Sequence, residues 1–459
     1  SKMKFVNKTK NSVQLEDINV SIPYVNDSPQ FIDAQSIKKS SAFQRMVAMG
    51  GFEVIEASNE RIEKNLFRIS KSFVKQDSQK ITRPLVGSKI EARLRGHFYE
   101  SSGYSKVNRN LAISLYRNGL NVEIEPISVS NNDMNEIEAK VFSFLRKPNS
   151  NKAILIDSVI PTQGSPLTDG YSILYTTSES SQVPKQFIDT ANLYNEVWVT
   201  SNFVKDSFRS SGCNKKITVV HPIVNKSSYN ENVIPYLFRP ALRSFVFLSV
   251  LTWDYRKGSD ALLRAYKHSF SKKDDVSLVL LISEKSKSAQ KQIRKEIFAI
   301  LGEEGPHVAI CTKHIPEYML PSFYKACNVF VLPSRGEGFG LTYCESSLCG
   351  LPVISTNYGG QLDFLNIENS TLVDVDSFDF AKNTGIHYWD NQPFPSLKSD
   401  KFIASLGDSM RFVMENYEKA KSKNKKLQSY ILENLSGEKI GFETKSILSE
   451  IWNNEGVKL

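Results

Sequence analysis

The sequence lacks apolar runs long enough to cross a bilayer, since stretches such as FVFLSVL and LVLLI have only the length of strands. The first residues, SKMKFVNKTK, are polar and basic with no apolar stretch behind them. We therefore predict neither a transmembrane segment nor a signal peptide, and we expect a cytoplasmic protein. A net charge of +9 leaves room for a peripheral contact with the inner face of a membrane.

Cysteine is scarce, and the few cysteines form no CxxC pair and no His-rich ligand spacing. An odd, scattered set is typical of reduced thiols in the cytosol, so we predict neither a disulfide framework nor a zinc site. DNA- and RNA-binding motifs are also missing, and no nucleic-acid partner is expected. The cysteines are Cys213, Cys311, Cys327, Cys344 and Cys349.

The basic residues are spread along the chain, with the densest groups in KSKSAQKQIRK and KAKSKNKK, two segments of helical character. We interpret these groups mainly as solvated helix faces. Attraction to anionic phosphates, either on a membrane or on a nucleotide substrate, is the alternative.

A length of 459 residues exceeds what one hydrophobic core serves, and the pattern along the chain predicts two α/β domains. Strand-like and helix-like segments alternate over residues 88–225 and again over 244–436, which favours parallel sheets covered by helices. Residues 226–243 show no clear period and are predicted to be a linker. The C-terminal stretch 437–459 has a Ser N-cap and predicts a closing helix, while residues 1–87 form an extension to which we assign no role.

The stretch PSRGEGFGLTYCESSLCG joins a buried strand, NVFVLPS, to a helix that begins near Leu341. Its glycines lie at the turn, where backbone N–H groups and the helix dipole favour an anion such as phosphate. Glu337 and Glu345 bracket this turn and would repel a phosphate, but carboxylates accept hydrogen bonds from paired hydroxyls. A nucleotide sugar offers both features, a diphosphate with polyols on either side.

This Glu-x7-Glu stretch resembles the retaining GT-B glycosyltransferases of the large family called glycosyl transferases group 1, or family 4-like. The resemblance extends to SVLTWDYRKGSDALLRAY, to the segment from YTTSESS to FRSSG, and to the late YWDNQPFPSLKSDKF, covering roughly residues 90–455. It implies two Rossmann-like domains that face each other across a cleft. The N-terminal domain would hold the acceptor and the C-terminal domain the donor.

The resemblance also implies roles for individual residues. The catalytic group would be Lys257 and Arg256, which neutralise the diphosphate, and Glu337, which faces the hydroxyls of the donor sugar. Glu345 would accept hydrogen bonds from the ribose. The remaining donor contacts would be mostly backbone contacts, from Gly338, Phe339, Gly340, Leu341 and Gly103, with the base pocket around His314 and Ile315.

The implied reaction is a hexosyl transfer from a UDP- or GDP-sugar, with retention of configuration and without a metal or other cofactor. The acceptor would be a glycan, a lipid-linked sugar or a glycoprotein, as in polysaccharide biosynthesis. The sequence departs from the family at Thr252, where a basic residue is common. A glycosyltransferase-like partner that has lost activity is therefore an alternative, and a glycan phosphorylase is another, although we find no pyridoxal phosphate lysine site.

Other polar residues have simpler interpretations. The DVD at 374–376 resembles a metal-binding motif but is expected to be a loop. His221 is expected to pack at a strand end, and packing is also favoured over catalysis for His97. Glu179 ends a strand, where an acceptor contact and a helix-capping role are equally good interpretations.

Overall fold

The computed structural model describes residues 89–100, 102–128, 145, 153–233, 235–238, 240–284, 286–312, 315 and 317–455, with short pieces before residue 58. In those pieces β1 (Lys2–Asn7) lies between β4 (Gln30–Asp33) and β5 (Phe52–Ala57) in an antiparallel sheet. A separate pair comprises β2 (Val13–Leu15) and β3 (Val20–Ile22).

The N-terminal domain contains a parallel sheet with the order β11-β10-β9-β8-β6-β7. Its strand order reverses at β6 (Glu91–Gly96), which lies between β7 (Asn121–Pro126) and β8 (Ile154–Ser158). Helix α4 follows β6 and begins where the Ser102 hydroxyl accepts a hydrogen bond from the Ser105 N–H. The other elements are η2 (Pro161–Gln163), β9 (Ser172–Thr176), α6 (Lys185–Ala191), β10 (Glu196–Val199), α7 (Asn202–Ser210) and β11 (Lys216–Val219), with α4 at Gly103–Arg117.

The C-terminal domain repeats this plan with the order β14-β13-β12-β15-β16-β17, and its order reverses at β12 (Phe245–Leu251). Every residue of β13 (Val276–Ile282) is buried, as expected for a continuously apolar strand covered on both faces. The other elements are η3 (Tyr255–Lys257), α8 (Ser259–Ser269), α9 (Lys287–Leu301), β14 (His307–Cys311), η4 (Glu317–Met319), α10 (Leu320–Lys325), β15 (Val329–Leu332), α11 (Leu341–Leu348), β16 (Val353–Thr356), η5 (Gly360–Asp363) and β17 (Thr371–Val373).

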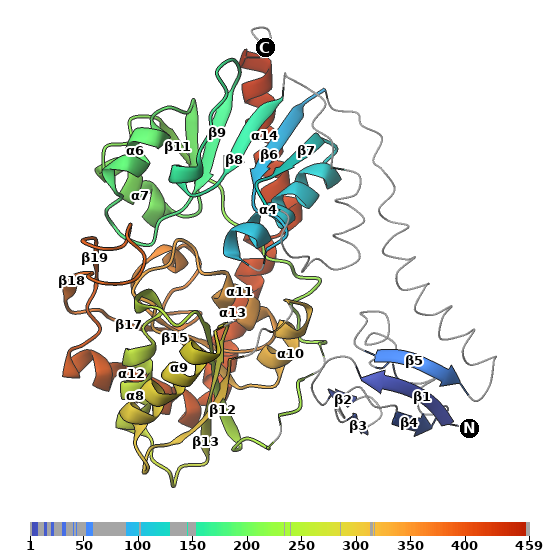
Figure 1. Ribbon diagram of the computed structural model, residues 1–459, viewed down its shortest axis with the longest axis vertical. Coiled ribbons are helices and arrows are strands. Elements are labelled where there is room, and N and C mark those ends of the chain that lie inside the picture. The colour runs from blue at the N-terminus through green and yellow to red at the C-terminus, as the bar shows by residue number, and fades with distance from the viewer. Residues whose placement is uncertain are drawn as a thin grey trace.

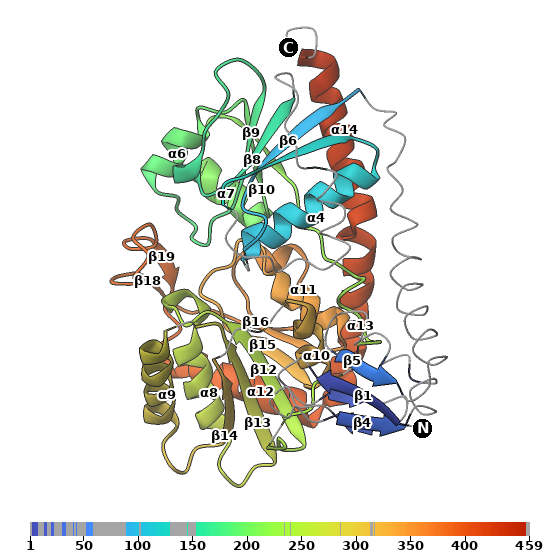
Figure 2. The ribbon, with the colours of Figure 1, turned by 45° about the vertical axis from the view of Figure 1, so that its right-hand side comes forward.

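After β17 the chain forms a hairpin of β18 (Phe378–Phe380) and β19 (Pro393–Pro395), then α12 (Asp400–Glu415), α13 (Tyr417–Asn434) and α14 (Gly437–Glu455). Helix α14 leaves the C-terminal domain and runs along the N-terminal one (Figures 1 and 2), where Lys445 donates to the Asn118 carbonyl at 2.7 Å. The helices cross closely, because a Cβ on Gly441 would lie 2.0 Å from the Ser114 hydroxyl oxygen. The C-terminal segment therefore ties the two domains together.

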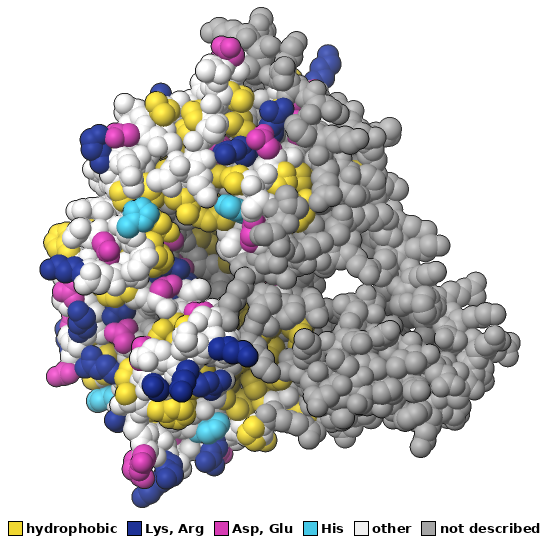
Figure 3. All heavy atoms as spheres, viewed as in Figure 1, with side chains coloured by type: hydrophobic (Ala, Val, Ile, Leu, Met, Phe, Trp, Pro, Cys, Tyr) yellow, Lys and Arg dark blue, Asp and Glu magenta, His cyan; other side chains and the backbone are white. Residues whose placement is uncertain are grey.

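The fold class is confirmed: two six-stranded parallel sheets with helices form an α/β architecture with two domains. The domain boundaries given above stay predictions, although the described part of 226–243 contains no helix and only one isolated bridge residue, Tyr236. The basic groups lie on α9 and α13, where Lys291, Arg294, Lys425 and Lys426 are exposed. Figure 3 shows basic and acidic side chains mixed over much of one face, with one group of basic side chains gathered in the lower part of the view.

Candidate active site

A cavity of about 560 Å³ lies between the two domains, and the surface is recessed where they meet (Figure 3). It is lined by the loops that follow β6 and β12, the two strands at which the sheet orders reverse, as well as by the ends of β9, β10 and β13. Ligands of open α/β sheets bind at such switch points, outside the carboxyl ends of the strands. The predicted residues that line it are Gly103, Arg256, Lys257, Ile315, Glu337, Gly338, Phe339, Gly340, Leu341 and Glu345.

The two predicted cations and Glu337 meet in this cavity. Lys257 Nζ lies 2.7 Å and Arg256 Nη1 lies 2.9 Å from the same oxygen, Glu337 Oε1. Burial disfavours the charge on Glu337, but Lys257 and Arg256 outweigh burial and hold its pKa at about 2. Burial and then the charge of Arg256 lower the pKa of Lys257, against the opposite effect of Glu337. The site therefore holds one carboxylate between two cations, an arrangement with net positive charge.

The bend that carries these cations is built by local interactions. Asp254 caps the turn by accepting from the Lys257 N–H at 3.1 Å, and Gly258 follows with φ +68°. A Cβ on Gly258 would lie 2.0 Å from the Pro333 carbonyl oxygen, so glycine lets this bend pack against the loop after β15. Because β12 pairs with β15, the bend and the Glu337 loop leave neighbouring strands on the same edge of the sheet.

The glycine loop before α11 is in close contact with the N-terminal domain. A Cβ on Gly338 would lie 1.8 Å from Thr177 Oγ1, and Thr200 Oγ1 donates to the Gly338 carbonyl at 2.9 Å. The sequence predicts that Gly338 lets the donor come close to the backbone. The structure shows that the N-terminal domain also comes close to Gly338. Gly340 has φ +94° and directly precedes α11, so it supplies the left-handed turn.

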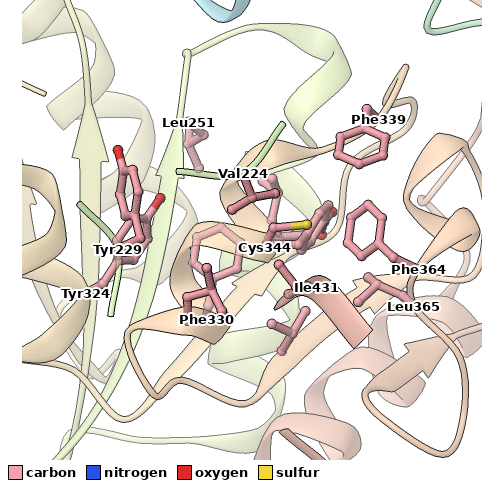
Figure 4. Packing of buried hydrophobic residues seen from close by; sticks show 14 of the residues in the cluster. Val224, Tyr229, Leu251, Tyr324, Phe330, Phe339, Cys344, Phe364, Leu365 and Ile431 are labelled. Carbon is pink, nitrogen blue, oxygen red and sulfur yellow. Dashed lines mark hydrogen bonds between the residues drawn. The ribbon is translucent and has the colours of Figure 1, made fainter. Parts of the chain in front are cut away.

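Glu345 lies on α11 with its side chain 2% exposed. Apolar packing fixes the helix, since Phe330, Phe364, Ile431 and Val224 surround Cys344 (Figure 4). The Glu345 carboxylate faces the N-terminal domain, where Lys106 Nζ on α4 donates a hydrogen bond to Glu345 Oε1 at 2.6 Å. Lys106 was not predicted as a site residue, because it lies in an ordinary amphipathic helix.

The remaining predicted donor contacts have simple placements. Gly103 is the first residue of α4, and a Cβ there would meet nothing within 4 Å, so the space beside it is open. Ile315 lines the cavity, whereas His314 lies outside the described residues. Thr252 also lines the cavity, but its hydroxyl donates to the Asp254 carboxylate, so this position provides no cation.

A second cluster adjoins the cations. The indole of Trp389, which follows β18, lies 5.3 Å from the Arg256 guanidinium and donates to Glu179 Oε2 at 3.2 Å. Glu179 lines the cavity, but it does not cap α6, which follows Pro184 without a side-chain cap. The capping interpretation of Glu179 is therefore wrong, because its carboxylate is held by the indole of the other domain. Trp389 was not predicted as a site residue.

The histidines and the DVD motif lie apart from the cations. His97 contacts Glu100, Ser128 and Gln163, all within the N-terminal domain. His221 follows β11 and lies 2.8 Å from Asp363 of the other domain. In the DVD loop, Asp374 accepts from Asn357 and Asp376 from Ser399. The described residues contain no group of three or more His, Cys, Asp or Glu side chains that could hold a metal ion.

Residues 243–385, which hold the cations, both glutamates and the glycine loop, match the family model described as "Glycosyl transferases group 1". The chain is similar to this family over about a third of its length. An O-antigen biosynthesis glycosyltransferase, WclY, from Escherichia coli is 38% identical over 92 residues, which are 18% of this chain and 25% of that protein. The chain thus spans about a quarter of the length of the curated relatives that it matches first.

Solved structures share the fold of this chain. The sucrose-phosphate synthase of Thermosynechococcus elongatus superposes with a TM-score of 0.57 at 15% identity, over 80% of this chain and all of that one. The Anabaena protein HepE, solved in complex with UDP-glucose, gives 0.55 at 12% identity, over 79% of this chain and all of that one. At these identities the likeness concerns the fold, and it places the chain among GT-B architectures.

Proposed function

We propose that this chain is a retaining glycosyltransferase that moves a hexose from a UDP- or GDP-sugar to a glycan, a lipid-linked sugar or a glycoprotein. The observation that carries the proposal is the meeting of Lys257, Arg256, Glu337 and Glu345 in one cavity between two domains. Supporting it, a relative acts in O-antigen biosynthesis and a structural neighbour was solved with UDP-glucose. The proposed setting is cytoplasmic; among the described residues no helix is both long and apolar enough to cross a membrane.

In the proposed reaction, negative charge develops on the departing diphosphate while positive charge develops on the anomeric carbon. Lys257 and Arg256 stabilise the diphosphate. When the donor binds, these cations exchange Glu337 for the diphosphate, and Glu337 accepts hydrogen bonds from the sugar hydroxyls instead. The fixed charges act in a buried cavity, where such stabilisation is strong. The departing phosphate accepts the acceptor's proton on the same face, which retains configuration. No step in this scheme requires a metal ion.

The first test is stabilisation by nucleotides. UDP or GDP, added at about 100 times its dissociation constant, should raise the melting temperature by on the order of 5 °C, with AMP as the control. The shift should persist in EDTA. If no nucleotide diphosphate shifts the transition, the chain is better described as a glycosyltransferase-like partner without a donor site.

The role of Glu345 is tested by Glu345→Gln, which keeps the side-chain volume but removes the charge. Loss of charged hydrogen bonds to the ribose should weaken UDP binding about 10- to 100-fold in calorimetry. Turnover at saturating donor should change far less, because the ribose is bound equally in the ground and transition states. Glu368→Gln, at a side chain that is 73% exposed, is the matched control. A fall in turnover with unchanged affinity would refute the ribose role.

A further inference from the structure

The contact between Lys106 and Glu345 joins the two domains inside the cavity. Lys106 lies on α4, one turn after Gly103, and Glu345 lies on α11, 239 residues later in the chain. Both ribbon views place the start of α4 directly above α11 (Figures 1 and 2). The two side chains are 17% and 2% exposed, so this is a buried ion pair that joins the two domains.

Few groups act on the Glu345 carboxylate besides Lys106. Glu317 of η4 is an opposing anion, and it lies 3.7 Å from Lys106 Nζ. The neutral groups around the Glu345 carboxylate are Tyr324 of α10 and the thiols of Cys344 and Cys349, and burial raises the pKa of all three. The hydroxyl of Tyr229 accepts a hydrogen bond from Lys106 at 3.3 Å. Among the described residues, Lys106 is the cation whose charge lowers the pKa of Glu345.

Two opposing effects act on the pKa of Glu345. Burial raises the pKa of Glu345, and Lys106 opposes this effect. Oε2 of the same carboxylate is buried without a hydrogen-bond partner among the described residues. Without Lys106, the effect of burial would be unopposed, so the pKa of Glu345 would rise further and the protonated form would be favoured. A protonated acid has one acceptor oxygen fewer, so it would bind a pair of hydroxyl donors poorly.

We propose that Lys106 is a positioning residue for the donor: it keeps Glu345 ready to accept the ribose hydroxyls, and it does so only when the two domains close. This inference rests on the proposed function, because it requires a nucleotide ribose at Glu345. The N-terminal domain thereby takes part in donor recognition, and closure and donor binding become coupled. An open cleft would withdraw Lys106 from Glu345.

The test compares UDP binding to Lys106→Met at pH 7.0 and pH 8.5. The terminal phosphate, with a pKa near 6, is ionised at both values. Loss of Lys106 should raise the pKa of Glu345 further, so UDP binding should be about 10-fold weaker than wild type at pH 7.0, and this defect should shrink several-fold at pH 8.5, where more of the carboxyl is ionised. The UDP affinity of wild type should not rise in this way between pH 7.0 and pH 8.5. Lys106→Arg, which keeps the charge, should restore most of the UDP affinity at pH 7.0.

Glu317→Gln is the interface control, because it breaks the contacts of α4 with η4, at 2.6 Å from Arg109 and 3.7 Å from Lys106, and it removes a charge that raises the pKa of Glu345. It leaves Lys106 on Glu345, so its UDP affinity relative to wild type should be the same at both pH values. A Lys106→Met defect that is equal at both pH values would show that Lys106 merely bridges the domains. Unchanged or tighter UDP binding by Lys106→Met would equally overturn the proposal.

A measurement without ligand separates this inference from the proposed function. In Lys106→Met the folded pKa of Glu345 should lie further above its unfolded value than in wild type, where burial already raises it, so the fall of stability with rising pH should extend to higher pH than in wild type. The double variant Lys106→Met with Glu345→Gln has no carboxyl to titrate there and should lose this trend. If the trend is absent from Lys106→Met, the inference fails even when wild type binds UDP. If the trend is present but no nucleotide binds wild type, the proposed function fails instead.

Discussion

Lys257→Met is expected to lower turnover by about 100- to 1000-fold, the usual cost of removing a fixed donor from the charge that develops in a transition state. Lys257 Nζ is 2.7 Å from Glu337 Oε1, in the cavity where the proposed diphosphate binds. The charge on the departing diphosphate grows as the glycosidic bond breaks, so the lost interaction belongs mainly to the transition state. Donor affinity should therefore weaken much less than turnover.

Steady-state kinetics with the donor selected by thermal shift would measure this effect. Lys267→Met is the matched control: the same substitution on α8, at an exposed lysine whose Nζ donates to the Ile300 carbonyl. Its turnover should equal that of wild type. A Lys257→Met enzyme with normal turnover and a raised KM would mean that Lys257 binds the donor uniformly, and Arg256 would then become the main candidate for stabilising the leaving group.

The secondary structure around the site was predictable because its signals are local. An apolar run such as Val276–Ile282 can be stable only as a buried strand between helices, and Ser102 marks the start of α4. Short elements without such signals were missed. Helix α6 follows a proline with no side-chain cap, and the β18–β19 hairpin lies in a stretch rich in aromatic and polar residues.

The meeting of Lys257 with Glu337 was expected only because the sequence resembles a known family. The two residues are 80 positions apart, and they meet because β12 pairs with β15 rather than only with its successor β13. Strand order of this kind depends on long-range packing, which periodicity does not report. Lys106 and Trp389 were missed for the same reason. Their partners, Glu345 and Glu179, lie in the opposite domain.

Gly338→Ala is the second substitution from which a large effect is expected, because it tests whether closure of the domains shapes the site. The new Cβ would stand 1.8 Å from Thr177 Oγ1 and 3.0 Å from Thr177 Cβ. Turning the Thr177 hydroxyl away would relieve the first contact but not the second, so we expect the N-terminal domain to shift away from the loop. A displacement of about 1 Å can lower the rate about 100-fold, and we expect at least this loss in kcat/KM. Each domain should still fold, with a melting temperature close to that of wild type.

The effect of Gly338→Ala has two possible origins, and a second substitution separates them. Thr177→Gly removes the side chain that the new Cβ would meet, and the next atom, the Ser178 carbonyl oxygen, is an ordinary contact at 3.4 Å. If closure is what Gly338 permits, the double variant should regain at least tenfold of the lost kcat/KM, beyond any effect of Thr177→Gly alone. Gly437→Ala, where the nearest atom would lie at 3.7 Å, is the control for adding a methyl group. If the double variant stays as impaired as Gly338→Ala, the methyl group blocks the donor itself, and Gly338 serves the ligand rather than the opposite domain.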